Sequence, residues 1–323
     1  MVKNILITGG AGYIGSHIVE ILIKQKKNIF IIDNLSTGYR KLINKKAKFL
    51  KIDIQKTKII NKIINKYKID SIIHLAASLV IGEGEKYPKK YFKNNVLGTQ
   101  SILNSCKGTK VNNFIFSSTA AVYKDGLYKV NESSKLKPKS VYGKTKLKAE
   151  KLVKFFCNKK KINYGILRYF NIVGSSSTGK IGLINKSDHL FKNFSREIFK
   201  KNPSLKIYGT DYDTKDGSCI RDFIHVSDIA EIHLKILERI EKTKQSNILN
   251  CGYSKGTSVL EVAKEFKRQS LKKIDIIKLS RRKGDLGKII ASNKNLKNFI
   301  KWKPKFNKLN VIVKSCLNWE KKQ

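Results

Sequence analysis

A tyrosine and a lysine, Tyr142 and Lys146, stand four positions apart in the segment SVYGKTK. In a helix this spacing places both side chains on one face, one turn apart. A tyrosine is a poor base at neutral pH because its pKa is about 10, but a neighbouring ammonium stabilises the phenolate and lowers that pKa. The upstream segment FSSTAAVY offers the hydroxyls of Ser117, Ser118 and Thr119, any of which can hold a substrate oxygen. These residues predict general acid–base chemistry on a substrate hydroxyl.

A glycine-rich segment near the start of the chain, TGGAGYIGSH, directly follows an apolar run at residues 3–8. Gly9, Gly12 and Gly15 fit the spacing GxxGxxG, and Gly10, Gly12 and Gly15 fit GxGxxG. Such glycines allow a tight turn between a strand and a helix, and they let the backbone approach a pyrophosphate at the helix N-terminus. The segment therefore predicts dinucleotide binding. The alternative, a purely structural turn, is disfavoured by the strand and helix on either side.

Two carboxylates follow the second and third apolar runs. Asp33 lies about twenty residues past the glycines, where a carboxylate accepts hydrogen bonds from the adenosine ribose hydroxyls of NAD. Its charge disfavours the extra phosphate of NADP, so Asp33 predicts NAD as the cofactor. The alternative role for Asp33 is a turn residue in the loop 34–38. Asp53 either caps the next helix or hydrogen-bonds the adenine edge, and the sequence leaves both roles open.

These groups need a scaffold, and the first half of the chain alternates short apolar runs with helical patterns. The runs are nearly continuous in Ile, Leu, Val and Phe, as in parallel strands that are covered on both faces. We expect strands at 3–8, 28–33, 47–52, 71–76, 113–117 and 164–169, and helices at 17–26, 58–67 and 141–160. This order predicts an α/β fold with a Rossmann-type, doubly wound parallel sheet.

The pattern loosens after residue 170, where glycine, serine and asparagine cluster in 171–185. We therefore expect an NAD-binding Rossmann domain at 1–170 and a smaller, C-terminal substrate-binding domain at 171–323. The boundary between them is soft, and the second domain is expected to interleave with the sheet of the first.

The charge of the chain is unusual, because 68 Lys and Arg stand against 24 Asp and Glu and give a formal net charge of +44. Such a charge attracts phosphate, so nucleic-acid binding is one interpretation. The lysines are spread over almost every segment, however, which favours a solvated surface and disfavours a nucleic-acid partner.

Cysteine and histidine usage indicates a reduced protein without a structural metal. The five cysteines form no CxxC pair, and the five histidines show no metal-ligand spacing. No apolar run approaches the roughly 18 to 20 residues of a membrane helix, and the N-terminus lacks the layout of a signal peptide. We expect a soluble, cytoplasmic protein with no metal and no membrane partner.

Together these motifs resemble the extended short-chain dehydrogenase/reductase family, and the likeness runs nearly from end to end. In the first half the shared motifs are TGGAGYIGSH, DNLSTG, HLAA, KNNVLGT, FSSTAAVY and YGKTKLKAE. In the second half RYFNIVG, TDYDTKDGSCIRDFIHVSDIA, LNCGYSKGTSVLEV and RRKGD narrow the resemblance to the UDP-glucose 4-epimerases. The resemblance implies reversible epimerisation of UDP-galactose and UDP-glucose at carbon 4, through a transient 4-keto sugar and with tightly bound NAD.

The resemblance also implies roles for individual residues. Catalytic roles fall on Thr119, Tyr142 and Lys146. Contacts to NAD fall on Gly9, Gly12, Tyr13, Ile14, Gly15, Asp33, Asn34, Asp53, Ile54, Ala76, Asn94, Lys146 and Phe170. Contacts to the UDP-sugar fall on Thr119, Tyr142, Asn171, His189, Leu190, Tyr208, Arg221, Arg282 and Asp285. The arginines offer fork-shaped donors to a diphosphate, and the sequence does not choose between Arg281 and Arg282 for the second of them.

Some positions depart from the family's pattern. Lys124 stands where many members have glycine, and Leu79 stands where some have a lysine near the nicotinamide. Ile289 occupies a position that shapes the sugar pocket, so UDP-N-acetylhexosamines and UDP-pentoses stay open as alternative substrates. A basic RNA-binding protein on an inactive scaffold is the alternative from another class, and the intact Tyr142, Lys146 and glycines disfavour it. The resemblance also implies a homodimer.

Overall fold

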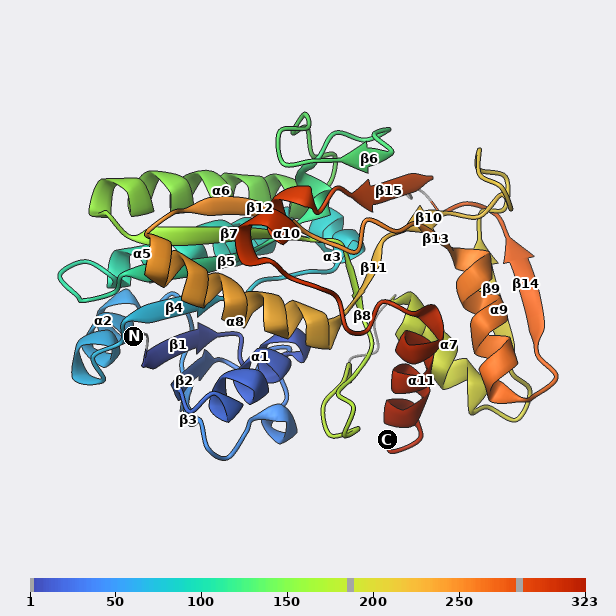
Figure 1. The fold of residues 1–323 in the computed structure, drawn as a ribbon, viewed down its shortest axis with the longest axis horizontal. Helices are drawn as coiled ribbons and strands as arrows, with labels where there is room; N and C mark the ends of the chain where they lie inside the picture. The colour runs from blue at the N-terminus through green and yellow to red at the C-terminus, as the bar shows by residue number, and fades with distance from the viewer. Residues whose placement is uncertain (1–2, 185–188, 283–286) are drawn as a thin grey trace.

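A parallel sheet of seven strands forms the centre of the protein (Figure 1). The computed structural model describes residues 3–184, 189–282 and 287–323. The strands of the sheet are β1 (Asn4–Thr8), β2 (Asn28–Asp33), β3 (Lys48–Lys51), β4 (Ser71–His74), β5 (Asn113–Thr119), β7 (Asn163–Tyr169) and β12 (Asn247–Cys251). Their order is β12-β7-β5-β4-β1-β2-β3, and every neighbouring pair is parallel. The order reverses between β1 and β4, and ligands of such sheets bind outside the carboxyl ends of the strands at this point.

Helices cover both faces of the sheet and confirm the predicted doubly wound α/β class. One face carries α1 (Tyr13–Lys24), α8 (Val226–Thr243) and α10 (Lys294–Ile300), and the other carries α2 (Thr57–Lys66), α5 (Gly98–Ser105) and α6 (Val141–Lys160). Successive residues of a strand point to opposite faces. Ile5 and Ile7 of β1 accordingly pack under α1 and α8, whereas Leu6 packs under the helices of the other face.

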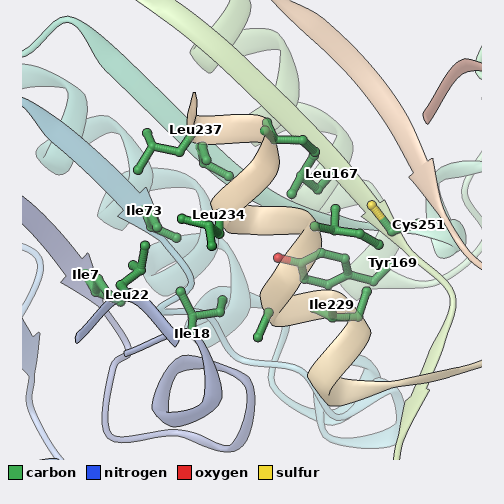
Figure 2. Packing of buried hydrophobic residues seen from close by; sticks show 14 of the residues in the cluster. Ile7, Ile18, Leu22, Ile73, Leu167, Tyr169, Ile229, Leu234, Leu237 and Cys251 are labelled. Atoms are coloured by element: carbon green, nitrogen blue, oxygen red, sulfur yellow. The ribbon is translucent and has the colours of Figure 1, made fainter. Parts of the chain in front are cut away.

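The layer beneath α8 joins the two halves of the chain. In Figure 2 Ile229, Leu234 and Leu237 of α8 belong to one apolar layer that also contains Leu167 of β7 and Cys251 of β12. All five side chains are buried. Burying an aliphatic side chain of this size contributes roughly 1.5–3 kcal/mol, so α8 anchors the second half of the chain firmly on the sheet.

The rest of 171–323 forms a smaller part, on the right of Figure 1, with short sheets of its own. Its strands are β8 (Asn171–Val173), β9 (Ser204–Tyr208), β10 (Ile220–Arg221), β11 (Phe223–His225), β13 (Thr257–Ser258), β14 (Asp275–Leu279) and β15 (Lys288–Ala291), and its helices are α7 (Leu190–Ile198), α9 (Val259–Ser270) and α11 (Leu309–Glu320). β8 pairs with β11, β9 pairs with β14, and β13, β10 and β15 form a sheet with β6 (Lys129–Val130). The two halves of the chain thus exchange strands, because β12 joins the large sheet and β6 joins a small one. The division at residue 170 stays a prediction.

Short helical segments connect these elements: η1 (Arg40–Leu42), α3 (Ile81–Lys86), α4 (Pro88–Tyr91), η2 (Phe92–Leu97) and η3 (Ala120–Val122). The expected strands are confirmed with shifts at their ends, since β4 stops at His74 rather than at residue 76 and β5 runs on to Thr119. α1 begins at Tyr13 rather than at residue 17, because Gly15 and Ser16 in its first turn are small and carry no apolar periodicity. Within the described ranges, no helix is long and apolar enough to cross a membrane.

Candidate active site

The glycine turn connects β1 to α1 where the strand order reverses. Gly9 has a φ of +74°, which favours glycine, and a Cβ there would lie 2.8 Å from the backbone nitrogen of Ala76. Gly15 is equally confined, since its Cβ would lie 2.3 Å from the carbonyl oxygen of Gly9. α1 follows Gly12 with no side-chain cap and no acidic residue in its first turn. The N–H groups of this turn therefore fit a pyrophosphate, which is the part of NAD that such turns bind.

Asp33 ends β2 beside this turn and is 8% exposed. Its Oδ2 accepts a hydrogen bond from the N–H of Ala11 at 3.1 Å, and its Oδ1 accepts one from the N–H of Leu35 at 2.8 Å. Burial raises the pKa of this carboxyl, while the two N–H donors act in the opposite direction. Asp33 therefore shapes the turn, as its alternative role requires. It also holds a carboxylate at the strand end where the ribose of NAD fits.

Asn34 and Asp53 link two neighbouring strand ends, because Asn34 Nδ2 donates to Asp53 Oδ2 at 2.9 Å. Asp53 Oδ1 also accepts from the N–H of Gln55 at 2.9 Å and so shapes the turn before α2. The N-cap of α2 is Lys56 rather than Asp53. A cap role for Asp53 is thus wrong, and its contact with adenine stays a prediction.

The other residues predicted to contact NAD lie near the carboxyl edge of the same sheet. Tyr13 and Ile14 open α1, and the Tyr13 hydroxyl donates to the carbonyl oxygen of Gly174 at 2.6 Å. The N–H of Ala76 follows β4 and donates to Thr8 Oγ1 at 3.3 Å. Two buried apolar members complete the set, Ile54 and Phe170.

Asn94 lies on η2, a π-helical turn of the kind that is frequent at functional sites. Its Nδ2 donates to Ser78 Oγ at 3.0 Å. The next residue, Asn95, is buried and was not predicted as part of the site. Asn95 accepts from the Ser78 N–H at 2.7 Å, and it donates to the Ser78 carbonyl at 3.0 Å and to Thr145 Oγ1 on α6 at 3.1 Å. It fixes the loop after β4 against the helix that carries Tyr142. The two adjacent asparagines in KNNVLGT are the sequence feature that could have indicated this role.

Tyr142, Lys146 and Thr119 come together where the carboxyl end of β5 meets the start of α6. Lys146 is 3% exposed, and its Nζ lies 4.2 Å from the centre of the Phe116 ring and 3.5 Å from Ser117 Oγ. The Thr119 side chain lies close enough to the Tyr142 hydroxyl to act on its pKa. The structure thus brings together the three residues predicted to be catalytic.

The electrostatics of this cluster are set by burial. Burial raises the pKa of Tyr142 to about 12, and the Thr119 side chain acts in the opposite direction. Burial also lowers the pKa of Lys146 to about 7, while the nearby Glu150 carboxylate acts to raise it. Neither charge forms easily alone, but a phenolate and an ammonium stabilise one another. The cluster can therefore hold and move a proton at the Tyr142 hydroxyl when a further positive charge, such as that of oxidised nicotinamide, lies beside it.

The three strand-end hydroxyls have different surroundings, which separates their roles. Ser117 Oγ donates to the carbonyl oxygen of His74 at 3.1 Å. Ser118 is 1% exposed, and its Oγ donates to a carboxylate oxygen of Glu150 at 2.5 Å. Thr119 is partly exposed and contacts Tyr142. The geometry therefore favours Thr119 as the hydroxyl that meets a substrate.

Three residues predicted to contact the UDP-sugar gather around β8. Asn171 begins this strand, is exposed, and donates its N–H to the carbonyl oxygen of Asp222 at 3.0 Å. His189 directly precedes α7, and its Nε2 lies 2.8 Å from the carbonyl oxygen of Ile172. Burial lowers the pKa of His189, which favours the neutral ring. Its Nδ1 is buried with no hydrogen-bond partner among the residues described. Leu190 follows as the first residue of α7.

Two arginines predicted to bind the diphosphate lie on the smaller part of the protein. Arg221 is on β10, and its Nη1 donates to the carbonyl oxygens of Ile220 and Gly287 at 3.0 and 3.3 Å. The guanidinium of Arg282 lies 5.1 Å from the centre of the Tyr208 ring. Tyr208 itself ends β9 and is 39% exposed. Arg282 and Tyr208 are thus adjacent, as a shared site for uridine diphosphate requires.

Arg281, the competing arginine, is engaged elsewhere. Its Nε donates to Asp211 Oδ1 at 2.7 Å, and its guanidinium lies 4.0 Å from the centre of the Tyr212 ring. This ion pair holds the loop after β14 against the loop after β9, whereas Arg282 is the arginine that lies against Tyr208. Asp285, predicted to bind the UDP ribose, lies outside the described residues.

No group of three or more His, Cys, Asp or Glu side chains in the described parts of the chain could hold a metal ion. All five cysteines are buried as free thiols. The sheet, the glycine turn and the adjacent tyrosine–lysine pair define a dinucleotide-dependent enzyme of the short-chain dehydrogenase/reductase class.

Comparison with known proteins identifies the family. A sequence model of the NAD dependent epimerase/dehydratase family matches residues 5–252. The chain is 36% identical over 322 residues to a UDP-glucose 4-epimerase of Lactobacillus helveticus, which covers 98% of this chain and 97% of that protein.

Two solved structures show how closely the fold follows these relatives. A UDP-glucose 4-epimerase from Stenotrophomonas maltophila, with bound NAD and formylated UDP-arabinopyranose, has a TM-score of 0.95 at 29% identity, with 99% of this chain and 98% of that chain covered. A UDP-Glc/GlcNAc 4-epimerase from Campylobacter jejuni has a TM-score of 0.86 at 37% identity, with 99% and 100% covered. The chain belongs to the NAD-dependent epimerase/dehydratase family and, within it, to the UDP-glucose 4-epimerases. The family resemblance and NAD as the cofactor are thereby confirmed.

Proposed function

We propose that this enzyme interconverts UDP-galactose and UDP-glucose by epimerisation at carbon 4, through a transient 4-keto sugar and with NAD that stays bound. The observation that carries this proposal is the cluster of Tyr142, Lys146 and Thr119, of which Lys146 is buried and the other two are partly buried, at the carboxyl edge of the sheet that also carries the glycine turn. A proton-transfer group beside a dinucleotide site is what oxidation of a secondary alcohol requires. The names of the Lactobacillus helveticus and Stenotrophomonas maltophila proteins support the same reaction.

When NAD is bound, its nicotinamide accepts a hydride from carbon 4 and returns it to the opposite face of the sugar. In the first half-reaction the Tyr142 phenolate takes the proton of the 4-hydroxyl, while Thr119 holds the oxygen. Lys146 supplies the positive charge that stabilises the phenolate. In the second half-reaction Tyr142 returns the proton to the oxygen on carbon 4, so the enzyme ends in its starting protonation state.

The two faces of the sugar can react only if the sugar turns while the nucleotide stays in place. We propose that Arg221 and Arg282 hold the diphosphate and that Tyr208 packs against uracil. Asp285 accepts hydrogen bonds from the ribose hydroxyls. Asn171, His189 and Leu190 complete the contacts to the UDP-sugar. Strong binding of UDP with loose binding of the hexose is what this turning motion requires.

The choice of sugar depends on the wall of the pocket. Ile289 on β15 is buried and packs with Phe170 and Val122 beside the catalytic strand end. This apolar wall leaves UDP-N-acetylhexosamines and UDP-pentoses open as alternative substrates. The Campylobacter jejuni neighbour is named for both glucose and N-acetylglucosamine substrates, so UDP-N-acetylglucosamine is tested alongside.

The test is conversion of UDP-galactose by purified protein with no added NAD, followed by chromatography of the sugar nucleotides. We expect UDP-glucose to form, with slower or no conversion of UDP-N-acetylglucosamine in a parallel reaction. Tyr142→Phe is expected to lose turnover by about 1,000-fold or more while keeping NAD and UDP binding, because it removes only the proton-transfer hydroxyl. No conversion of either substrate, even with NAD supplied, would refute the proposal.

We also propose a homodimer. Phe92 and Leu97 on η2 are 38% and 42% exposed, and Phe155 on the neighbouring α6 is 69% exposed. Apolar side chains gathered on two adjacent helical segments support burial against a second copy. Light scattering with size-exclusion chromatography tests this, and Phe155→Lys is expected to yield monomers.

Two further expectations stay proposals. A cytoplasmic location is supported by five cysteines that are all free and buried. Nucleic acid is not proposed as a partner, because the lysines lie on almost every segment rather than in one tail or one helix. Filter binding with RNA at physiological salt is expected to show no specific retention.

A further inference from the structure

A buried ion pair lies directly behind the catalytic cluster. Glu150 is on α6, one turn after Lys146 and two turns after Tyr142, and Arg168 is on β7. Arg168 Nε and Nη2 donate to the two carboxylate oxygens of Glu150 at 3.0 and 2.8 Å. Both side chains are 2% exposed. The fork geometry makes this a strong and specific contact between the helix and the sheet.

The pair extends into a network that reaches the catalytic strand. Ser118, next to Thr119 on β5, donates its hydroxyl to Glu150 at 2.5 Å. On its other side, Arg168 Nη1 donates to the Tyr123 hydroxyl at 3.0 Å. Tyr123 in turn donates to the side-chain carbonyl of Asn250 on β12 at 2.6 Å. The network therefore ties α6 to β5, β7 and β12 immediately behind the active site.

A buried ion pair is a poor device for stability, because desolvation offsets its attraction and an apolar pair of the same size does as well. Its position gives it another use. We propose, on the basis of the function proposed above, that the Glu150–Arg168 pair is a positioning element. It holds Thr119 and Lys146 in place beside Tyr142, and because its two charges compensate one another it adds no net charge next to these residues. Neither residue touches the substrate. Each acts through the groups that do.

Other titratable and charged groups also surround this part of α6, and the substitutions in the pair leave their side chains in the sequence unchanged. From β4 comes His74, whose pKa burial lowers to about 3. From β7 comes Tyr169, hydrogen-bonded to His233 at 2.7 Å. From the loop after β6 comes Glu132, whose carbonyl oxygen accepts a hydrogen bond from Arg168 Nη1 at 3.2 Å. The charged and titratable groups of α3, α4 and η2 are Glu83, Glu85, Lys86, Lys89, Lys90, Tyr91 and Lys93.

Removing one charge of the pair exposes the other to the catalytic cluster. Glu150→Gln leaves the Arg168 guanidinium uncompensated. Its charge favours the Tyr142 phenolate and disfavours the Lys146 ammonium, whose pKa the Glu150 carboxylate acts to raise, so the acid limb of the kcat/KM profile, set by Tyr142, and the alkaline limb, set by Lys146, both move to lower pH. Arg168→Gln leaves the carboxylate uncompensated and moves both limbs to higher pH. A unit charge about 10 Å away at an effective dielectric constant of about 20 gives a shift of about one pH unit. In the double variant the pair is neutral again, and both limbs return to their wild-type positions.

The experiment is the pH dependence of UDP-galactose epimerisation for these three variants, each checked for fold by circular dichroism and for bound NAD. Opposite shifts for the single variants and a restored profile for the double variant are expected. A merely structural pair would lower activity without shifting the profile. Glu320→Gln is the matched control, because it breaks the buried ion pair of Glu320 with Lys192 (2.7 Å) between α11 and α7; its profile is expected not to shift.

Ser118→Ala tests the positioning role in a variant with no charge change. It is expected to lower kcat about 10-fold at unchanged KM, since it loosens the strand end that carries Thr119 and leaves the UDP contacts intact. A wild-type kcat for Ser118→Ala, or unshifted profiles for both single variants, would overturn the inference. Failure of the proposed function is distinguishable, because the wild-type enzyme would then be inactive as well.

Discussion

Gly15→Ala isolates the role of the glycine turn from every other feature of the NAD site. The added Cβ would lie 2.3 Å from the carbonyl oxygen of Gly9, 2.8 Å from the Cα of Gly10 and 3.1 Å from the carbonyl carbon of Gly9. Ordinary van der Waals contact begins at 3.4 Å. The obstacles are backbone atoms, so no side chain can rotate away, and the turn must open by about 1 Å to accept the methyl group.

The expected magnitude follows from this clash. Overpacking of a confined site costs about 1–3 kcal/mol, and the upper part of that range applies because backbone must move. The free protein can relieve the strain by opening the turn, whereas the NAD complex needs the turn closed around the pyrophosphate. A cost of about 2–3 kcal/mol falls on binding and corresponds to a roughly 30- to 150-fold increase in the Kd for NAD.

The assay is calorimetric titration of NAD into cofactor-stripped protein, together with the NAD content of each protein as purified. Gly82→Ala on α3 is the matched control, because it makes the same chemical change at an exposed glycine with nothing within 4 Å of the new Cβ. It is expected to bind NAD like the wild type and to gain up to about 1 kcal/mol of stability, as alanine replaces glycine in a helix. Equal NAD affinity for the two variants would refute the assignment of the turn to the pyrophosphate.

Three further predictions concern the cofactor, the substrate and acid stability. Asp33→Asn is expected to raise the Kd for NAD about 10- to 100-fold and to reduce the preference of the enzyme for NAD over NADP. Kd values for both dinucleotides equal to those of the wild type would contradict this prediction. Arg282→Ala is expected to raise the KM for UDP-galactose about 100-fold, against about 10-fold or less for Arg281→Ala, and equal effects would count against Arg282 as the diphosphate ligand. Burial lowers the pKa of four histidines from 6.5 to about 3 or 4. Below pH 6.5 the unfolded chain therefore binds more protons than the folded protein. The free energy of unfolding is highest above about pH 6.5 and is lower by about 2 kcal/mol per histidine at pH 5. The four residues are His17, His74, His225 and His233. Urea unfolding at pH 7.5 and 5.0 measures the loss of stability, and identical unfolding midpoints at the two pH values would contradict it.

The first half of the fold was predictable because its physics is local. A strand buried on both faces reads as a continuous apolar run, and β2 at 28–33 has the predicted bounds. The glycine turn is equally local, since its spacing alone specifies a strand–turn–helix. β12 escaped prediction for the opposite reason. Its five residues, NILNC, are too short and too polar to read as a buried strand. The strand exists because Leu249 pairs with Leu167, which is far away in the chain.

The site divides in the same way. Tyr142 and Lys146 share a helix face, so their spacing predicts that they act together. Arg168 and Glu150 meet only when β7 lies against α6, and an arginine inside an apolar strand gives no local sign of its partner. Asn95 is a similar case, because its importance comes from the loop after β4 that it holds in place.

The most direct test of the proposed reaction uses UDP-galactose with deuterium at carbon 4, incubated with purified enzyme in ordinary water and without added NAD. If the bound cofactor removes hydrogen from carbon 4 as hydride and returns it to the same carbon, the UDP-glucose formed keeps the deuterium at carbon 4. Mass spectrometry and NMR of the product measure this. Retention of the label in nearly all product molecules is the expected result, whereas UDP-glucose that has lost its deuterium to solvent would contradict hydride transfer and, with it, the role assigned to NAD.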